Sequence, residues 1–226
     1  GDRVVLLDEN ATIISPDRLL SLFAQMCLEN HPQKEIVFDV KCSQMVANTV
    51  QQLGGQAKMI RTGSSFLLTY LTQSNGAAVF GGEYAGHYVF NDGRGFGYDD
   101  GLYAALRVME YLTHSSSANL SALLKQYPER CCTEDTYIST HDINPLSVLN
   151  EIETLSQDLG AQLSKIDGVR LDFNDGFGII RASNTGEYFT VRFDADHPDR
   201  LVEIRDKFVS MLQTRYPQIA QELAQA

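Results

Sequence analysis

The amino-acid sequence predicts an α/β protein with two domains: an α/β/α layered domain with a mixed sheet, followed by an α+β domain with an antiparallel sheet and helices on one face. Up to about Leu112, short β-branched runs alternate with amphipathic helical stretches, which is typical of a layered α/β domain. Beyond about Arg130 the strand-like runs follow one another across short turns, which favours antiparallel pairing. The 226 residues, 43% of them hydrophobic, suffice for two small cores.

The first domain is expected over residues 1–130. Amphipathic spacing predicts its helices, and short apolar runs between turn residues predict its strands. The helices are predicted at residues 17–28, 43–53 and 101–112, with a short one through Leu124 that ends before Pro128. The strands are predicted at residues 4–7, 12–14, 36–40, 57–60, 64–72 and 77–80.

The second domain is expected over residues 131–226. Its strands are predicted near residues 133–139 and at residues 169–173, 177–182 and 188–194. Helices are predicted at residues 145–159 and 198–212. Consecutive strands flanked by helices predict an antiparallel sheet with its helices on one face.

Composition and charge narrow the classes of function. A formal net charge of −11 argues against a general nucleic-acid binder, since phosphate backbones need clustered Lys and Arg. A small anionic ligand stays possible, because a few Arg side chains in one cleft can hold a phosphate. The chain has no apolar run near 18 residues and opens with Gly-Asp-Arg, so we expect a soluble cytoplasmic protein without a membrane partner. Its four cysteines lack a C-x-x-C pair and are expected to be thiols.

The densest polar cluster is the segment Gly82-Glu83-Tyr84-Ala85-Gly86-His87, which lies between two strand-like runs. Its glycines let the backbone turn sharply and approach a ligand. Glu83 can accept hydrogen bonds from vicinal hydroxyls, and His87 can donate or shuttle a proton near neutral pH. The cluster therefore suggests recognition of sugar hydroxyls. A tight turn with solvated Glu and His side chains is the open alternative.

A second cluster, residues 181–186, reads Arg-Ala-Ser-Asn-Thr-Gly between two strands, with Arg192 on the following strand. Guanidinium groups, hydroxyls and the backbone N–H groups of a turn are the donors that a phosphate dianion needs. The cluster suggests a phosphate clamp, and an ordinary polar hairpin turn is the open alternative.

Three further positions carry polar groups near expected strand or helix ends. Lys41 follows a buried-looking strand, where ligands of α/β sheets commonly bind, so its ammonium group could reach a sugar phosphate. Asp99 or Asp100 suits the N-cap of the helix that begins near Gly101, and we expect capping rather than metal binding there. Asp2 alone cannot hold Mg²⁺ firmly, since that ion needs near-octahedral oxygen coordination.

Taken in this order, these segments resemble the phosphomannomutase/phosphoglucomutase branch of the α-D-phosphohexomutases over nearly the whole chain. The opening Gly-Asp-Arg is similar to the end of the family's magnesium loop, Asp-x-Asp-x-Asp-Arg. Residues 13–20 and 38–42 resemble its third domain, and residues 82–87 resemble its sugar loop, G-E-x-S-G-H. Residues 167–170 and 181–185 resemble the fourth domain, whose R-x-S-x-T loop grips the phosphate that is not transferred.

The resemblance implies a mutase that interconverts hexose 6-phosphate and hexose 1-phosphate of mannose and glucose, through a phosphoserine and a bisphosphorylated intermediate. It also implies Mg²⁺ and a hexose 1,6-bisphosphate activator. The resemblance assigns Asp2 to the metal and Arg3 and His87 to catalysis. The implied substrate-binding residues are Lys41, Glu83, His87, Arg181, Ser183, Asn184, Thr185 and Arg192.

The chain departs from the family pattern at several positions. Ala85 stands where the family has Ser, Ser64 stands where related mutases have His, and Gly186-Glu187 replaces a common x-Pro. No segment resembles the phosphorylatable serine loop of the first domain. We therefore expect domains three and four only, inactive alone, with domains one and two as missing partners; the oligomeric state stays open.

Three alternatives to this interpretation remain. The first is a non-catalytic sugar-phosphate-binding homologue, and the second is a phosphoglucosamine mutase. The third is a glycan- or nucleotide-binding module unrelated to mutases.

Overall fold

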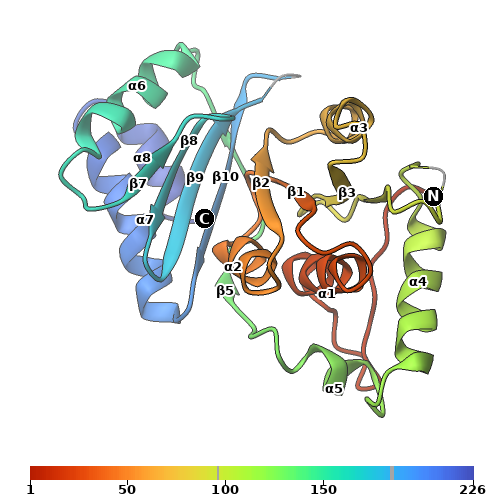
Figure 1. Ribbon diagram of the computed structural model, residues 1–226. Coiled ribbons are helices and arrows are strands. Elements are labelled where there is room, and N and C mark those ends of the chain that lie inside the picture. Colours follow the sequence, from red (N-terminus) through yellow and green to blue (C-terminus); the bar gives the residue numbers. More distant parts are fainter. Residues whose placement is uncertain (96, 184–185) are drawn as a thin grey trace. The chain divides into compact units, whose positions relative to one another are not determined.

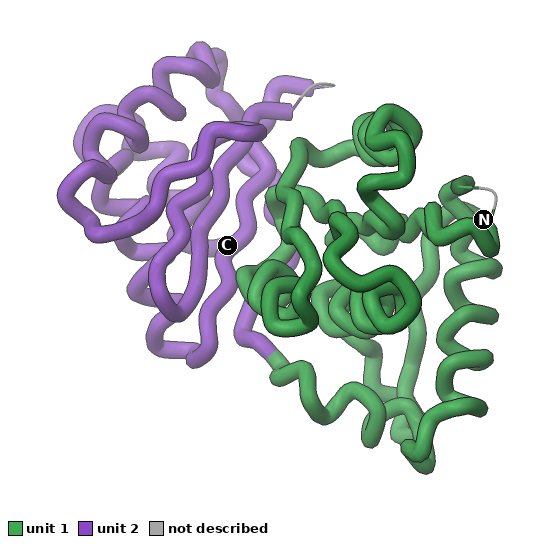
Figure 2. Tube along the Cα trace, viewed as in Figure 1, with its two compact units in different colours: residues 1–129 green, residues 130–226 purple. Residues whose placement is uncertain are grey.

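The computed structural model describes residues 1–95, 97–183 and 186–226. The chain divides into two compact units, residues 1–129 and 130–226 (Figure 2). Each unit has a hydrophobic core of its own. Among the described helices, none is both long and apolar enough to cross a membrane.

Unit 1 is built on a four-stranded mixed sheet. Its strands are β1 (Glu35–Asp39), β2 (Gln56–Ile60), β3 (Ala78–Gly82) and β4 (Tyr88–Phe90), in the order β2-β1-β3-β4. β1 runs parallel to both β2 and β3, and β4 is antiparallel to β3. The three parallel strands therefore end at the same edge of the sheet, where ligands of α/β folds bind.

Helices cover both faces of this sheet (Figure 1). The core of one face is formed with α1 (Pro16–Leu28), α2 (Gln44–Gln52), α4 (Gly101–His114) and α5 (Leu120–Leu124). The other face packs against α3 (Ser64–Gln73), which buries Leu67 and Leu71 against Val37 and Val89. The predicted α/β/α layering of the first domain is confirmed.

The larger core of unit 1 centres on one aromatic side chain of α1. Phe23 is fully buried, and its ring centroid lies 5.5 Å from Phe80, 5.0 Å from Tyr88 and 5.1 Å from Phe90. These tilted and edge-on contacts are the arrangements that aromatic rings prefer. Phe23 thereby fixes α1 on the two strands that flank the Glu83 turn.

Unit 2 is a six-stranded antiparallel sheet with helices on one face. The strands are β5 (Cys131–Cys132), β6 (Thr136–Ser139), β7 (Gln162–Ser164), β8 (Val169–Phe173), β9 (Gly176–Ala182) and β10 (Tyr188–Ala195). They run in the order β5-β10-β9-β8-β7, with β6 also paired to β10. The helices α6 (Pro145–Leu155), α7 (Pro198–Gln213) and α8 (Pro217–Leu223) pack together on one side (Figure 1). The predicted α+β class is confirmed.

Three predicted strands of the first domain are wrong. Residues 64–72 form α3, because Leu67 and Leu71 lie one helical turn apart and are buried on the same face. Residues 4–7 and 12–14 form no sheet strand. They face each other only through an isolated bridge between Leu7 and Ile13, outside the four-stranded sheet.

Elsewhere the structure adds elements that the sequence pattern did not separate. β7 and α8 were not predicted, and the helix expected at residues 145–159 ends at Leu155. β7 is only three residues long, too short for an alternation pattern to be recognised.

Truncating Phe23 to alanine should destabilise unit 1 by roughly 3–5 kcal/mol, since it deletes a fully buried aromatic ring from a packed core. Hydrogen exchange in denaturant, followed at amides of α1 and β3, would measure the loss for this unit separately from unit 2. The control Leu102→Ala removes a side chain that is 70% exposed and should change little. Equal effects of both substitutions would contradict this account of the core.

Candidate functional site: the strand-end loops of unit 1 and the Arg181 loop of unit 2

Three loops of unit 1 meet at the carboxyl ends of the parallel strands. Asp39 ends β1 and is fully buried. Its Oδ1 accepts hydrogen bonds from the Tyr84 amide at 3.0 Å and the Cys42 thiol at 3.1 Å, and its Oδ2 accepts one from the Thr62 hydroxyl at 2.9 Å. Donors from the loops after β1, β2 and β3 therefore share one carboxylate.

Glu83 lies in the tight turn between β3 and β4 and is only 2% exposed. Its Oε1 accepts a hydrogen bond of 2.6 Å from the Gly63 amide, at the start of α3. Burial raises the pKa of Glu83 to about 7, and the charge of Asp39 adds to the rise. The Gly63 amide, His87 and Lys41 act in the opposite direction.

Lys41 is also buried, with 7% of its surface exposed, in the loop that follows β1. It lies close enough to Glu83 for its charge to lower the pKa of that carboxyl. The structure thus brings together Lys41 and Glu83, two predicted substrate-binding residues that are far apart in the sequence. A buried ammonium beside a protonatable carboxyl offers both a donor and an acceptor to a sugar hydroxyl or a phosphate.

The first residues of the chain are held against the Glu83 turn. Val4 donates to the Gly86 carbonyl at 3.2 Å, and the Gly101 amide donates to the Gly1 carbonyl at 3.0 Å. A Cβ at Gly101 would lie 2.4 Å from the Arg3 carbonyl oxygen, so only glycine permits this close approach. Asp2 and Arg3 are therefore positioned beside His87 and are not a frayed terminus.

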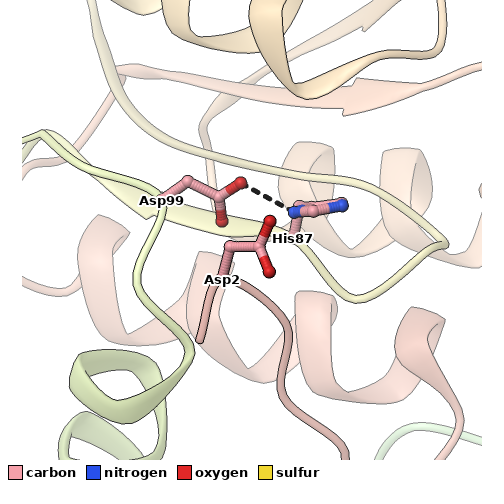
Figure 3. Close-up of side chains that lie close together, drawn as sticks. All are labelled: Asp2, His87 and Asp99. Carbon is pink, nitrogen blue, oxygen red and sulfur yellow. Dashed lines mark hydrogen bonds and ion pairs between the residues drawn. The ribbon is translucent and has the colours of Figure 1, made fainter.

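His87 is bound on both ring nitrogens. The Arg3 Nε donates to His87 Nε2 at 3.0 Å, and Nδ1 lies 2.7 Å from Asp99 Oδ2 (Figure 3). Because Nε2 accepts from a guanidinium, Nδ1 carries the proton and donates it to the Asp99 carboxylate. Burial raises the pKa of Asp99, while His87 lowers it. Arg3 and Asp99 together set the tautomer and the orientation of the ring.

The two acidic residues before α4 have different tasks. Asp100 is the N-cap and accepts from the Tyr103 amide at 3.0 Å, whereas Asp99 binds His87. The expected capping role therefore belongs to Asp100, and sequence reasoning missed the pairing of Asp99. The only sequence signal for this pairing was that a second carboxylate stands next to the N-cap residue of α4.

Asp2, His87 and Asp99 form a cluster whose ligand atoms lie within 4.8 Å of one another. Mg²⁺ prefers oxygen ligands, and both ring nitrogens of His87 are already engaged, so His87 does not suit a metal. The Asp2 side chain is 64% exposed, and Figure 3 shows its carboxylate beside the His87–Asp99 pair. The exposed Asp2 carboxylate offers the kind of oxygen ligand that Mg²⁺ prefers, and by itself it supplies fewer ligands than that ion needs.

In unit 2, Arg181 is anchored near the end of β9. Its Nε donates to Asp167 Oδ2 at 2.9 Å, and its Nη1 donates to the Thr190 hydroxyl at 3.3 Å. The Asp167 turn fits closely against β9, since a Cβ at Gly168 would lie 2.3 Å from the Ile180 carbonyl oxygen. These contacts hold the guanidinium in one orientation at the base of the loop.

Of the other predicted phosphate-binding residues, Ser183 follows β9 and Arg192 lies on β10. Ser183 accepts from the Gly186 amide at 3.2 Å through its hydroxyl, and its own amide donates to the Tyr188 carbonyl. Arg192 is 1% exposed, lies over the Phe177 ring at 5.3 Å and donates to Asp194 at 3.2 Å. Asn184 and Thr185 lie outside the described residues.

The predicted site residues that the structure describes therefore lie in two groups, one in each unit. Asp2, Arg3, Lys41, Glu83 and His87 come together at the strand ends of unit 1. Two of the departures from the family pattern lie nearby: Ser64 begins α3 directly after Gly63, and Ala85 lies in the Glu83 turn. Asp39 and Thr62 were not identified from the sequence as the residues that join the strand-end loops. A signal was present, because an aspartate stands at the end of a strand that was expected to be buried.

The fold and the strand-end loops define an α/β/α layered domain with polar groups at the carboxyl ends of its parallel strands, and comparison with known proteins identifies its family. A family model described as phosphoglucomutase/phosphomannomutase, alpha/beta/alpha domain III, matches residues 15–131. The chain belongs to this phosphoglucomutase/phosphomannomutase family.

Individual relatives extend the similarity over nearly the whole chain. The chain is 37% identical to a phosphomannomutase/phosphoglucomutase of Pseudomonas putida over 97% of its length, and 37% identical to a phosphoglucomutase of Neisseria gonorrhoeae over 95%. A crystal structure of a phosphoglucomutase/phosphomannomutase family protein from Burkholderia thailandensis superposes with a TM-score of 0.86 at 34% identity, over 97% of this chain and 46% of that one. The chain spans 46% of the length of both curated relatives.

We expect neutral His87 to carry its proton on Nδ1, because Arg3 donates to Nε2 and Asp99 accepts from Nδ1. Long-range ¹H–¹⁵N spectra at about pH 8, above the ordinary imidazole pKa of about 6.5, report the tautomer directly. Asp99→Ala should lower the Nδ1–H population. The control Asp100→Asn keeps a capping residue and should leave the tautomer unchanged. Nε2–H as the main form of the native protein would refute this assignment.

The raised pKa of Glu83 should make stability depend on pH. A carboxyl with a pKa of about 7 in the folded state and 4.5 ordinarily binds its proton more tightly when folded. Its contribution is full below about pH 4.5 and is lost as the pH rises through about 7, a change of at most about 3 kcal/mol.

Glu83→Gln should remove this pH dependence, because glutamine keeps the acceptor for the Gly63 amide and does not titrate in this range. Chemical denaturation between about pH 4 and about pH 8 measures it. The control Glu110→Gln removes an exposed carboxyl whose pKa Arg94 lowers, so any slope it removes has the opposite sign. Parallel curves for native and Glu83→Gln proteins would show that Glu83 titrates normally.

Proposed function

We propose that this chain provides the sugar-recognition and phosphate-binding domains of a phosphomannomutase/phosphoglucomutase, which interconverts hexose 6-phosphate and hexose 1-phosphate of mannose and glucose. Residues 1–130 act as its third domain and residues 131–226 as its fourth. The observation that carries the proposal is the convergence of Lys41, Glu83 and the Arg3–His87–Asp99 chain at the strand ends of a family-matched domain.

Each group has a chemical task in this reaction. Glu83 accepts from sugar hydroxyls, and its pKa of about 7 allows it to exchange a proton near neutral pH. Lys41 binds the sugar phosphate by charge. His87, oriented by Arg3 and Asp99, holds or transfers a proton at the reacting oxygen, and Arg3 also supplies positive charge there.

Arg181, with Ser183, Asn184, Thr185 and Arg192, binds the phosphate that does not react. Holding that end of the substrate positions the other end for transfer. A fixed, bidentate guanidinium suits a phosphate better than a mobile ammonium does, and Asp167 and Thr190 fix Arg181.

The proposed reaction also needs a metal ion, a phosphoserine nucleophile and an activator. Asp2 is one ligand of a Mg²⁺ ion, which neutralises charge on the transferred phosphoryl group when bound. The phosphoserine nucleophile belongs to a first domain, which works with this chain together with a second domain, and a hexose 1,6-bisphosphate serves as activator. We place this activity in the cytoplasm, where phosphorylated sugars are handled.

A coupled mutase assay on the complete gene product, with Mg²⁺, hexose 1,6-bisphosphate and either mannose 1-phosphate or glucose 1-phosphate, tests the proposal. Turnover of either sugar would show that Ser64, Ala85 and Gly186-Glu187 are tolerated variations. Binding without turnover, with a phosphorylated serine present, would favour the non-catalytic sugar-phosphate-binding homologue. Equal binding of phosphate-free sugars would favour a glycan-binding module.

Within that assay, Arg181→Lys should raise KM for hexose phosphates roughly tenfold or more, because the ammonium keeps the charge and loses the paired N–H donors. kcat should change less, since the residue holds the end of the substrate that does not react. The control Arg200→Lys alters an arginine bound to Asp175 and Glu203, away from the loop, and should leave KM unchanged. An unchanged KM in Arg181→Lys would remove this residue from the phosphate site.

A further inference from the structure

A single buried carboxylate joins the three loops that carry the candidate sugar site. Asp39 Oδ1 accepts from the Tyr84 amide and the Cys42 thiol, and Oδ2 accepts from the Thr62 hydroxyl, at 2.9 to 3.1 Å. The donors come from the loops after β1, β2 and β3. Helices and strands separate these three loops in the sequence, so no short stretch of chain connects them.

Burial makes these hydrogen bonds costly to lose. Asp39 has no exposed surface, and a buried carboxylate without its donors is strongly unfavourable. Each loop therefore has one position in which its donor is hydrogen-bonded to the carboxylate, and in other positions this hydrogen bond is lost. The carboxylate consequently selects one arrangement of three loops that glycines and turns would otherwise leave adjustable.

Each donor is adjacent to a group of the candidate site. Cys42 follows Lys41, Thr62 precedes the Gly63 amide that binds Glu83, and Tyr84 follows Glu83. A shift of any one loop would move Lys41, the Gly63 amide or Glu83 against the other two. Both ends of the Glu83–Gly63 hydrogen bond thus lie one residue from a contact with Asp39.

We propose that Asp39 is a positioning residue of the sugar site: its carboxylate holds the loops of Lys41, Gly63 and Glu83 in one register without touching the substrate. This inference deepens the proposed function and rests on it only for the identity of the substrate.

Asp39 also acts on Glu83 through its charge. The charged groups that face Glu83 are Asp39, Lys41 and His87; Asp39 raises the pKa of Glu83, and the other two lower it. Removing the Asp39 charge while keeping its shape should therefore favour ionised Glu83. A purely structural role of Asp39 would leave this titration unchanged.

Two substitutions separate the charge of Asp39 from the links between loops. Asp39→Asn keeps an acceptor for the Tyr84 amide, and its new NH₂ group can donate to the Thr62 hydroxyl, so mainly the charge is lost. Thr62→Val keeps the charge and removes the link to the loop after β2. The matched control is Thr69→Val, the same change on the exposed surface of α3, where the hydroxyl donates only to Ser65 within the helix.

The measurements use the 226-residue chain without substrate. ¹³C NMR should show the Glu83 titration midpoint below its native value of about 7 in Asp39→Asn and near it in Thr69→Val. Amide exchange at Gly63 should be about tenfold faster in Thr62→Val, because its loop is released. The inference would be overturned if Asp39→Asn had the native Glu83 midpoint and Thr62→Val had the native Gly63 exchange rate, with the fold intact in both variants.

Kinetics of the complete gene product then test the link to function. Thr62→Val should raise KM for both hexose phosphates, Asp39→Asn should shift the acidic limb of kcat/KM to lower pH, and Thr69→Val should do neither. If the native protein has no mutase activity, the proposed function fails, while the NMR measurements still decide the role of Asp39. If activity is present and the KM of Thr62→Val is native, the positioning role is refuted.

Discussion

The buried carboxylate of Asp39 is the constraint on which the candidate sugar site depends. In a parallel sheet the strand ends meet at one edge, yet the loops that leave them are free to take many paths. Hydrogen bonds from Tyr84, Cys42 and Thr62 to one carboxylate remove that freedom. Because Asp39 is fully buried, the cost of an unsatisfied charge stabilises the arrangement more than any single exposed hydrogen bond would.

A second chain of contacts adds the start of the sequence to the same place. Arg3, His87 and Asp99 come from the first residues, from the Glu83 turn and from the segment before α4. Close backbone packing of Gly101 on Arg3 leaves no room for a side chain, so the three groups share one small region. Asp39 thus fixes the loops of Lys41 and Glu83, and the contacts of Arg3 and Asp99 fix the His87 ring.

In unit 2 the candidate site depends on a guanidinium group that projects from one face of a sheet. Side chains alternate along its strands, so Val169, Leu171 and Phe193 enter the helix-covered core and Arg170, Arg181 and Arg192 share the opposite face. Arg170 and Arg192 pair with Asp172 and Asp194 across Phe177. Arg181 continues this face toward the loop after β9, held by Asp167.

The sequence by itself determined the two fold classes, most helices and strands, and the loops that carry the candidate site residues, because local periodicity and loop composition depend on neighbouring residues. It did not determine that residues 64–72 form α3, since a short apolar run suits either element. Nor did it reveal that Asp99 binds His87 and Asp100 caps α4, or that Asp39 joins three loops. His87 lies 12 residues from Asp99 and Tyr84 lies 45 residues from Asp39, so only the strand order and the packing of the tertiary structure decide which carboxylate meets which of these donors.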